Sequence, residues 1–280
     1  MPIKLIADSG STKCEWCLLV DGKKKKITTK GISPYFLNKE QIAELLQKEL
    51  LGKIKDTQID AVYFYGTGLG NKNNVKLMNA TLKKTFPSSK IEINNDLLAA
   101  ARALCGKEKG IACILGTGSN SGYYNGKKIL RSNPGIGYIL GDEGSGTYLG
   151  KKVIQYFLYQ TFDENLNAAF IKKFNVSGSE ILDNVYKKPL ANRYIASFTE
   201  FLSENRGHFM VENIIEDGLN DFFFMHLLKY RESWTSPINF SGSVAYFFRD
   251  VLKTICSSYE LELGKIIRSP MDGLIEYHNK

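Results

Sequence analysis

The sequence predicts an α/β protein in which one layered arrangement of strands and helices occurs twice. Strands and helices alternate over the first 110 residues, a second round of strands begins near residue 110, and three glycine–hydroxyl turns each follow a strand. Such alternation is typical of a sheet covered by helices. With 280 residues, 43% of them hydrophobic, the chain can form one large domain or two smaller ones.

The first 110 residues are predicted to run β-β-β-α-β-α-β-α. The polar turn DSGSTK joins two apolar runs, and KEQIAELLQKELL has apolar residues at helical spacing. DLLAAARALCG is rich in helix formers and ends at a glycine, a common helix terminator. The expected elements are strands 3–9, 14–20 and 26–31, helix 39–51, strand 59–65, helix 72–86, strand 90–96 and helix 96–105.

The second round begins with GIACILGTGSNSGYYNGKKIL, which has the same order of features as LIADSGSTKCEWCLLVDGKKKKI. Each is a strand, a small-residue turn, a strand, an Asn/Asp-Gly turn and a lysine-bearing strand, so we expect a duplicated domain facing its twin. Beyond it, residues 160–235 are predicted to be mostly helical. PINFSGSVAYFFRDVL indicates a strand, a turn and a helix, and GKIIRSP a last strand before a short final helix.

Composition excludes several classes of protein. No segment reaches the ~18 apolar residues of a membrane span, and the start MPIKLIADSG lacks the apolar core of a signal peptide. We therefore expect a cytoplasmic protein without a membrane partner. The net charge is +8, yet no stripe of aromatic and basic residues suggests nucleic-acid binding. The lysine run 23–26 follows Asp21-Gly22, so we expect it at a solvated hairpin turn.

The five cysteines do not indicate a disulfide framework or a zinc site. Their number is odd, and no second pair lies near Cys14-x-x-Cys17. These two cysteines fall in a predicted strand, where side chains three residues apart point to opposite faces. We therefore expect free thiols. The three histidines likewise lack metal-like spacing and are interpreted as structural or surface residues.

The glycine turns DSGSTK, GTGSNSG and SGSVA could hold an anion. Glycine lets backbone N–H groups converge on a phosphate, and serine and threonine hydroxyls add donors. Two such turns from duplicated domains could grip the phosphates of a nucleotide from two sides. Asp8 would then hold Mg²⁺ through water, and Lys13 would neutralise phosphate charge. None of the turns matches the Walker P-loop pattern.

Two further segments could carry chemistry. Asn95-Asp96 falls at the end of a strand and the start of a helix, where an acid is either an ordinary helix cap or a base for a substrate hydroxyl. GIGYILGDEGSGTYLG is too rich in glycine for a plain helix start. Its backbone is expected to lie close to a ligand or to another segment of the chain.

In this order and spacing, DSGSTK, NNDLLAAARA, GTGSN, GDEGSG and SGSVA resemble the BadF/BadG/BcrA/BcrD-type ATPase family, in particular its N-acetylglucosamine-kinase-like members. The resemblance covers essentially the whole chain, including the closing SPMDGLIEYH. This family belongs to the actin-like and hexokinase-like ATPase superfamily. The resemblance therefore implies two ribonuclease-H-like domains around a nucleotide and sugar cleft. These would be residues 1–110, with the final helix 271–280 packed back on them, and residues 111–270.

The resemblance also implies site residues by position. Asp96 is similar to the catalytic base of the sugar kinases. The first phosphate turn would comprise Asp8, Ser9, Gly10, Ser11, Thr12 and Lys13, and the second Gly116, Thr117 and Gly118. Adenosine would lie near Ala196, Gly242 and Ser243, and the sugar near Ser119, Asn120, Gly135, Ile136 and Asp142.

The implied activity is an ATP- and Mg²⁺-dependent kinase for a small-molecule sugar, with Asp96 deprotonating the acceptor hydroxyl, expected to be O6. We further expect a homodimer. The sequence departs from the family at Tyr35, where a sugar-contacting asparagine would fall, at Ile136, usually aromatic, and at Tyr246, usually basic. The departures at Tyr35 and Ile136 concern the sugar, so N-acetylglucosamine and N-acetylmuramic acid both stay open, whereas Tyr246 falls near adenosine.

Two alternatives are open at this stage. One is an activator ATPase of 2-hydroxyacyl-CoA dehydratases, which would need cysteines such as Cys105 and Cys113 to bridge an iron–sulfur cluster across a dimer. The other is a nucleotide-dependent sensor or structural ATPase without transferase activity.

Overall fold

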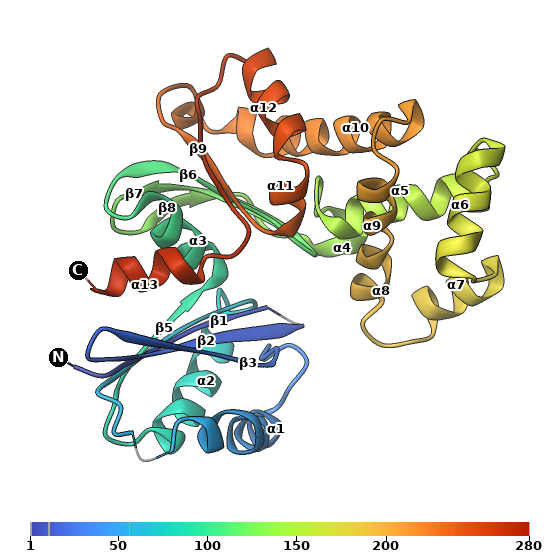
Figure 1. Cartoon of the computed structure of the whole chain (residues 1–280). Helices are drawn as coiled ribbons and strands as arrows, with labels where there is room; N and C mark the ends of the chain where they lie inside the picture. Colours follow the sequence, from blue (N-terminus) through green and yellow to red (C-terminus); the bar gives the residue numbers. More distant parts are fainter. Residues whose placement is uncertain (1, 11, 56, 280) are drawn as a thin grey trace. The chain divides into compact units, whose positions relative to one another are not determined.

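The structure, a computed structural model, describes residues 2–10, 12–55 and 57–279. The chain divides into two compact units (Figure 1). Unit 1 comprises the residues up to Gly106 together with those from Pro270 onward, and unit 2 is Lys107–Ser269. Each unit contains one five-stranded sheet with helices, which confirms the expected α/β class. The domain boundaries expected near residues 110 and 270 stay a prediction.

The sheet of unit 1 has the order β3-β2-β1-β4-β5. Antiparallel pairing joins β1 to β2 and β2 to β3, whereas β4 and β5 continue from β1 in parallel. The short turns after β1 and β2 permit antiparallel hairpins, while the parallel strands follow helical crossovers. The strands are β1 (Lys4–Ser9), β2 (Lys13–Val20), β3 (Lys23–Lys30), β4 (Ala61–Gly66) and β5 (Lys90–Asn95).

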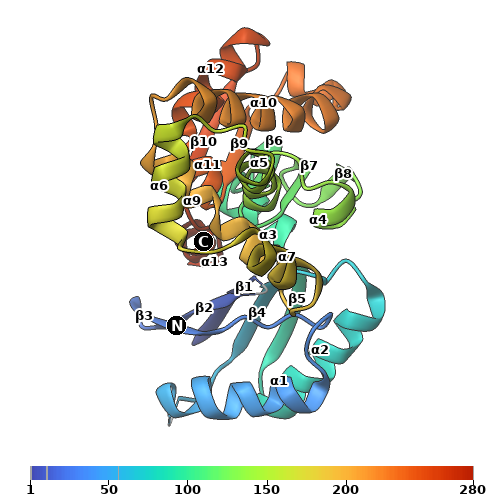
Figure 2. The same cartoon turned by 90° about the vertical axis from the view of Figure 1, so that its right-hand side faces the viewer.

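Alternating side chains cover both faces of this sheet. On one face, residues such as Leu5 and Trp16 pack with α1 (Lys39–Leu45) and α2 (Lys72–Thr85). On the other face, residues such as Ile6 pack with α3 (Asp96–Cys105) and α13 (Met271–Asn279). Figure 2 shows these two helices on this side of the sheet. The C-terminal helix thus completes the core of unit 1. It approaches α3 closely because a Cβ on Gly273 would lie only 2.5 Å from the carbonyl oxygen of Ala103.

Two local expectations for unit 1 need correction. The helix expected at 39–51 changes geometry after Leu45, becoming a π-helical turn η1 (Leu46–Leu50) and then a 3₁₀ turn η2 (Leu51–Lys53). The lysine run 23–26 lies within strand β3, not at the hairpin tip, which is Asp21-Gly22. Because β3 is an edge strand, its exposed lysines discourage pairing with a strand of another chain.

The cysteines behave as expected from strand geometry. Cys14 and Cys17 are free and buried, and they belong to the cores on opposite faces of the sheet. The three remaining cysteines, Cys105, Cys113 and Cys256, form no disulfide either. No described cysteine therefore forms a disulfide.

Unit 2 repeats the topology of unit 1, which confirms the internal repeat. Its sheet has the order β10-β9-β6-β7-β8, with β6, β7 and β8 antiparallel and β9 and β10 parallel to β6. This matches β5-β4-β1-β2-β3 strand for strand. The strands are β6 (Lys109–Leu115), β7 (Ser119–Asn125), β8 (Ile129–Ser132), β9 (Ile238–Ser241) and β10 (Leu263–Ile267).

Unit 2 differs from unit 1 by a long helical insertion between β8 and β9. Its apolar residues form one core with Ile111, Cys113 and Leu115 of β6. The helices are α4 (Gly137–Leu140), α5 (Gly146–Leu158), α6 (Glu164–Phe174), α7 (Gly178–Tyr186), α8 (Ala191–Ser197), α9 (Thr199–Glu204), α10 (Phe209–Met225), η3 (Leu227–Lys229) and η4 (Arg231–Trp234), followed after β9 by α11 (Ser243–Phe247) and α12 (Arg249–Ser258). Within the described ranges, no helix is both long and apolar enough to cross a membrane.

A polar cluster fixes α13 to the sheet of unit 1. The guanidinium of Arg102 donates to the Tyr65 hydroxyl at 2.5 Å and to Glu92 at 2.8 Å, and the hydroxyl lies 2.8 Å from Nε2 of His278. Because arginine can only donate, the Tyr65 hydroxyl donates its proton to a neutral His278. Burial, with the positive charge of Arg102, lowers the pKa of His278 to about 4. The folded state therefore favours uncharged His278.

We expect this cluster to make unit 1 less stable in acid. The unfolded chain protonates His278 below pH ~6.5 and the folded chain only near pH ~4, so stability is full above pH ~6.5 and falls between these values. A shift of this size corresponds to about 3 kcal/mol, and the partial exposure of the ring reduces the expected loss from His278 to about 2 kcal/mol. His278→Phe, which keeps an aromatic ring against Tyr63, should flatten this part of the pH profile in denaturant unfolding. An unchanged profile in the variant would contradict the assignment.

Candidate functional site

The first glycine turn follows β1 in unit 1 and is closed by backbone hydrogen bonds. The Gly10 N–H donates to the carbonyl of Lys13 at 3.0 Å, and the carbonyl of Thr12 accepts from the Gly31 N–H at 2.9 Å. Gly10, Thr12 and Lys13 are exposed. The predicted phosphate residue Ser11 lies outside the described residues. The turn therefore presents a fixed backbone with its described side chains toward solvent.

Ser9, also predicted in this turn, has a different environment. It is buried, and its hydroxyl accepts from the Ile32 N–H at 2.8 Å and donates to the Ile32 carbonyl at 3.0 Å. The hydroxyl thus fastens the end of β1 to the segment after β3. It stabilises the turn through these bonds, and its role at a phosphate stays a prediction.

Two carboxylates meet where the parallel strands end. β1, β4 and β5 are adjacent, with Ser9 opposite Gly66 and Gly66 opposite Asn95, so Asp8 and Asp96 lie at the same edge of the sheet. Burial, together with the negative charge of Asp96, raises the pKa of Asp8 to about 7. No hydrogen bond or ion pair joins the Asp8 carboxylate to the described part of the chain, and Lys13 pairs instead with Glu15 at 2.6 Å.

Asp96 is not the cap of helix α3. The side chain of Asn95 accepts from the Leu98 N–H at 2.9 Å and is the N-cap. Asp96 is the first helical residue, and its carboxylate accepts from the Leu97 N–H at 2.9 Å. Burial raises the pKa of Asp96, with backbone hydrogen bonds acting in the opposite direction. Of the two interpretations of Asn95-Asp96, the cap therefore applies to the asparagine.

The second glycine turn, Gly116–Gly118, follows β6 in unit 2 and is attached to the start of α5. The Gly146 N–H donates to the Gly116 carbonyl at 2.8 Å, and the Thr147 N–H donates to the Thr117 carbonyl at 3.0 Å. The first N–H groups of α5 are therefore not available to a ligand. The N–H groups of Thr117 and Gly118 make no hydrogen bond to the described part of the chain, so they could bind an anion.

Three distant segments meet this second turn at positions without large side chains. A Cβ on Gly242, which has φ +126°, would lie 2.2 Å from the Leu115 carbonyl oxygen. A Cβ on Gly146 would lie 3.3 Å from the Cβ of Ala196. The structure thus brings Ala196 and Gly242, both predicted near adenosine, to the second turn. Ser243 follows Gly242 as an exposed residue at the start of α11.

Three of the predicted sugar residues lie together beside this turn. The Ser119 N–H donates to Oδ1 of Asp142 at 3.4 Å, and a Cβ on Gly118 would lie 2.9 Å from Oδ2 of the same carboxylate. The Ser119 hydroxyl is buried and has no hydrogen-bond partner among the described residues. Asn120, the next residue, accepts from the Ser121 N–H at 2.9 Å. Burial raises the pKa of Asp142, opposed by the hydrogen bond from Ser119.

The other predicted sugar residues are more exposed. Gly135 and Ile136 lie in the loop before α4, and Ile136 is 52% exposed. Ile136 nevertheless packs on Gly141, since a Cβ there would lie 2.6 Å from its Cγ1. Tyr35, in unit 1, is 64% exposed, and its ring lies against Gly68. The exposed loop is thus joined through Gly141 to the backbone next to Asp142.

Sequence reasoning missed several residues around this group. Nε2 of His226 lies 3.0 Å from Oε2 of Glu143, and both side chains are nearly buried. The pair spans 83 positions of sequence, so no local pattern could reveal it. Glu143 follows Asp142, whose φ is +59°, and the pair helps to hold this unusual backbone. The dense glycines of residues 135–146 were the only available signal.

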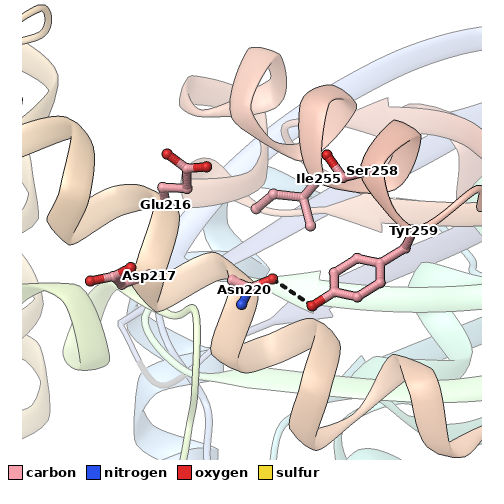
Figure 3. A pocket seen from close by; sticks show the side chains of 6 residues that line it. All are labelled: Glu216, Asp217, Asn220, Ile255, Ser258 and Tyr259. Atoms are coloured by element: carbon pink, nitrogen blue, oxygen red, sulfur yellow. Dashed lines mark hydrogen bonds between the residues drawn. The ribbon is translucent and has the colours of Figure 1, made fainter.

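A separate pocket of about 250 Å³ lies between α10 and α12 (Figure 3). Its lining includes two acids, and the Tyr259 hydroxyl donates to Asn220 at 2.8 Å. None of the predicted site residues lines it. Its full lining is Glu216, Asp217, Asn220, Ile255, Ser258 and Tyr259.

Comparison with known proteins gives relatives for this arrangement, although no family model matches the sequence. The N-acetylmuramic acid/N-acetylglucosamine kinase of Clostridium acetobutylicum is 26% identical over 198 residues, which are 66% of this chain and 64% of the relative. This match therefore spans less than two-thirds of that relative's length.

Solved structures give a longer match. A proposed N-acetylglucosamine kinase from Porphyromonas gingivalis is 39% identical, with a TM-score of 0.94 over 99% of this chain and 98% of that one. MreB 5 of Spiroplasma citri, solved with AMPPNP, is 11% identical, with a TM-score of 0.61 over 100% of this chain and 95% of that one. At this low identity the second likeness concerns the fold alone. Together they confirm two ribonuclease-H-like units of the actin-like type.

The capping geometry predicts opposite effects of two neighbouring substitutions on stability. Asn95→Ala removes the N-cap of α3 and should lower the free energy of unfolding by about 1 kcal/mol. Asp96→Asn should leave it unchanged or raise it at pH 7, because the raised pKa of Asp96 means that folding disfavours its charge. Urea unfolding of both variants checks this. An equal loss in the two variants would make Asp96 a structural residue.

Proposed function

Because the chain belongs to the N-acetylglucosamine-kinase-like sugar kinases of the actin-like ATPase superfamily, we propose that it transfers the γ-phosphoryl group of ATP to an N-acetylated hexosamine. The observation that carries this proposal is the position of Asp96. It is a half-buried carboxylate at the carboxyl ends of the parallel strands β1, β4 and β5, and a neighbouring asparagine caps the helix in its place. Such a group is available for proton transfer.

In the proposed reaction Asp96 orients the acceptor hydroxyl and takes its proton. Burial raises the pKa of its carboxyl group, and a higher pKa makes the carboxylate a stronger base. Positioning and charge neutralisation supply most of the catalysis in phosphoryl transfer. We assign O6 as the acceptor, as in the expectation from sequence.

The residues of the first turn fit a hydrated Mg²⁺. Asp8 is a half-buried carboxylate without a partner among the described residues, and the negative charge of Asp96 contributes to its raised pKa. A divalent cation near Asp8 would offset both the cost of burying the Asp8 charge and its repulsion from Asp96. Mg²⁺, when bound, would neutralise charge on the phosphates. We therefore assign Asp8 to Mg²⁺ through water, and Gly10 to Lys13 to the phosphates.

The second turn fits a phosphate through its backbone. The N–H groups of Thr117 and Gly118 have no partner in the described part of the chain, and no heavy atom lies within 4 Å of a Cβ placed on Gly116. We assign adenosine to Ala196, Gly242 and Ser243. The basic residue absent at Tyr246 has a substitute nearby, since the guanidinium of Arg249 lies 5.0 Å from the centre of the Tyr246 ring.

The sugar is assigned to Ser119, Asn120 and Asp142, with Gly135 and Ile136 at its side. The buried, unpartnered Ser119 hydroxyl supports this assignment, because an unsatisfied polar group is unfavourable unless a ligand completes it.

The expected homodimer stays a prediction.

The alternative of an activator ATPase would place cysteines such as Cys105 and Cys113 at an iron–sulfur cluster. A cluster-bridging cysteine must present its thiolate at a surface shared by two chains. Cys113 instead belongs to the apolar core of unit 2, among the side chains of β6 and the helical insertion.

Asp96→Asn should lower turnover by roughly 10²–10⁴, the usual contribution of a positioned acid–base group, while ATP binding is retained. Steady-state kinetics and nucleotide titration measure the two quantities. Asn95→Ala is the matched control, because it removes the cap of the same helix without touching the base. If Asp96→Asn kept wild-type turnover, the assignment of the base would be wrong.

A competition assay with glucose, N-acetylglucosamine and N-acetylmuramic acid tests the proposed substrate class. We expect both N-acetylated sugars to have a higher kcat/KM than glucose. A site with buried polar groups such as Ser119 discriminates against a ligand that leaves them unpaired, by up to about 10⁴. Preference for glucose, or no phosphorylation of any sugar, would refute the proposed function.

A further inference from the structure

An unpaired ammonium group lies in the loop region of the proposed sugar residues in unit 2. Lys151 stands on the second turn of α5 and is half-buried. Its Nζ donates one hydrogen bond, to the carbonyl oxygen of Tyr138 in α4 at 3.3 Å. Among the described residues, no carboxylate oxygen lies within the 4.0 Å of an ion pair with this nitrogen. Since an ammonium carries three N–H donors, donors remain for a ligand.

The same ammonium influences the predicted sugar carboxylate. Burial raises the pKa of Asp142, and the positive charge of Lys151 is one of the influences that lower it again. Among the described residues, Lys151 forms no ion pair with Asp142, and its hydrogen bond to Tyr138 attaches it to the segment that leads into this carboxylate. A ligand that reached the Asp142 carboxylate would also enter the field of this cation.

The segment that contains Tyr138 also carries the two other predicted sugar residues, Ile136 and Asp142. Ile136 precedes α4 and packs on Gly141, the residue before Asp142. One short segment, residues 136–142, thus connects an apolar side chain, the carbonyl that binds Lys151 and the Asp142 carboxylate. A cation, an acid and an apolar group are held together within unit 2.

We infer that Lys151 recognises a carboxylate carried by the sugar, so that the enzyme prefers an acidic N-acetylated hexosamine to its neutral counterpart. This inference rests on the proposed kinase function and specifies its substrate. An acidic sugar brings a second negative charge close to Asp142, and Lys151 offsets that repulsion. The lactyl ether of N-acetylmuramic acid carries one carboxylate and one methyl group, which match Lys151 and the half-exposed Ile136.

The neighbouring residue provides a matched control. Lys152 is also half-buried, and the two ammonium groups lie 5.5 Å and 5.9 Å from the centre of the same Tyr148 ring. Lys152 makes no hydrogen bond to the described part of the loop. The two lysines thus share charge, helix and aromatic contact, and differ in their attachment to the loop.

The experiment compares Lys151→Met, Lys151→Arg and Lys152→Met with the wild type on three sugars. These are N-acetylglucosamine, N-acetylmuramic acid and the amide of N-acetylmuramic acid, which has nearly the same shape without the charge. Lys151→Met should lower kcat/KM for N-acetylmuramic acid by about tenfold or more, as expected for a charged hydrogen bond. The two neutral sugars should change by less than about threefold. Lys151→Arg should retain part of the preference, and Lys152→Met should retain all of it.

The outcomes separate this inference from the proposed function. An equal loss for all three sugars would show that Lys151 only anchors the loop. No loss, or wild-type enzyme that phosphorylates N-acetylglucosamine but not N-acetylmuramic acid, would overturn the inference alone. If no sugar is phosphorylated, the proposed function fails. Calorimetric titration of N-acetylmuramic acid and its amide then still decides whether Lys151 binds the carboxylate.

Discussion

The hydrogen bond from the Gly146 N–H to the Gly116 carbonyl is the contact on which the arrangement of unit 2 depends. It fixes the start of helix α5 against the turn after β6, and a second bond from Thr147 to Thr117 sets their register. Bonds of this kind require two backbones to approach without a Cβ between them. The glycines around the site therefore serve backbone contact, although glycine in a helix is intrinsically unfavourable.

Close backbone packing has a consequence for what the site can offer a ligand. The N-terminus of α5 would ordinarily be a ready anion site, since the first N–H groups of a helix are unsatisfied. Here the chain itself uses those of Gly146 and Thr147. The donors without a partner in the described chain are instead the N–H groups of Thr117 and Gly118 in the turn and the buried Ser119 hydroxyl. The donors that could bind an anion or a sugar therefore lie in the hairpin rather than at the start of the helix.

Unit 1 has the same topology and a different electrostatic character. Its turn follows Asp8, whereas the turn of unit 2 follows Leu115, a buried core residue. Burial raises the pKa of both half-buried carboxylates at this sheet edge, and the negative charge of Asp96 raises that of Asp8 further. Such an arrangement is unfavourable for the free protein. A cation at Asp8 and a substrate hydroxyl at Asp96 would both stabilise such a site.

The sequence alone determined the α/β class, the repeat and most elements, because strand and helix patterns and turn residues act over a few positions. It also placed Cys14 and Cys17 on opposite faces, since the period of a strand is local. The π-helical end of the first helix and the start of β3 at Lys23 were missed, because packing and strand pairing override local propensity there.

Only the tertiary structure decided which residues meet. The approach of Ala196 and Gly242 to the second turn, the pairing of Glu143 with His226 and the unpaired ammonium of Lys151 all depend on segments distant in sequence. Family resemblance could assign Ala196 and Gly242 by position, but no local pattern could locate the other three. The choice between cap and base at Asn95-Asp96 was also tertiary. It depends on which side chain reaches the free N–H groups of α3, and backbone geometry gives that task to Asn95.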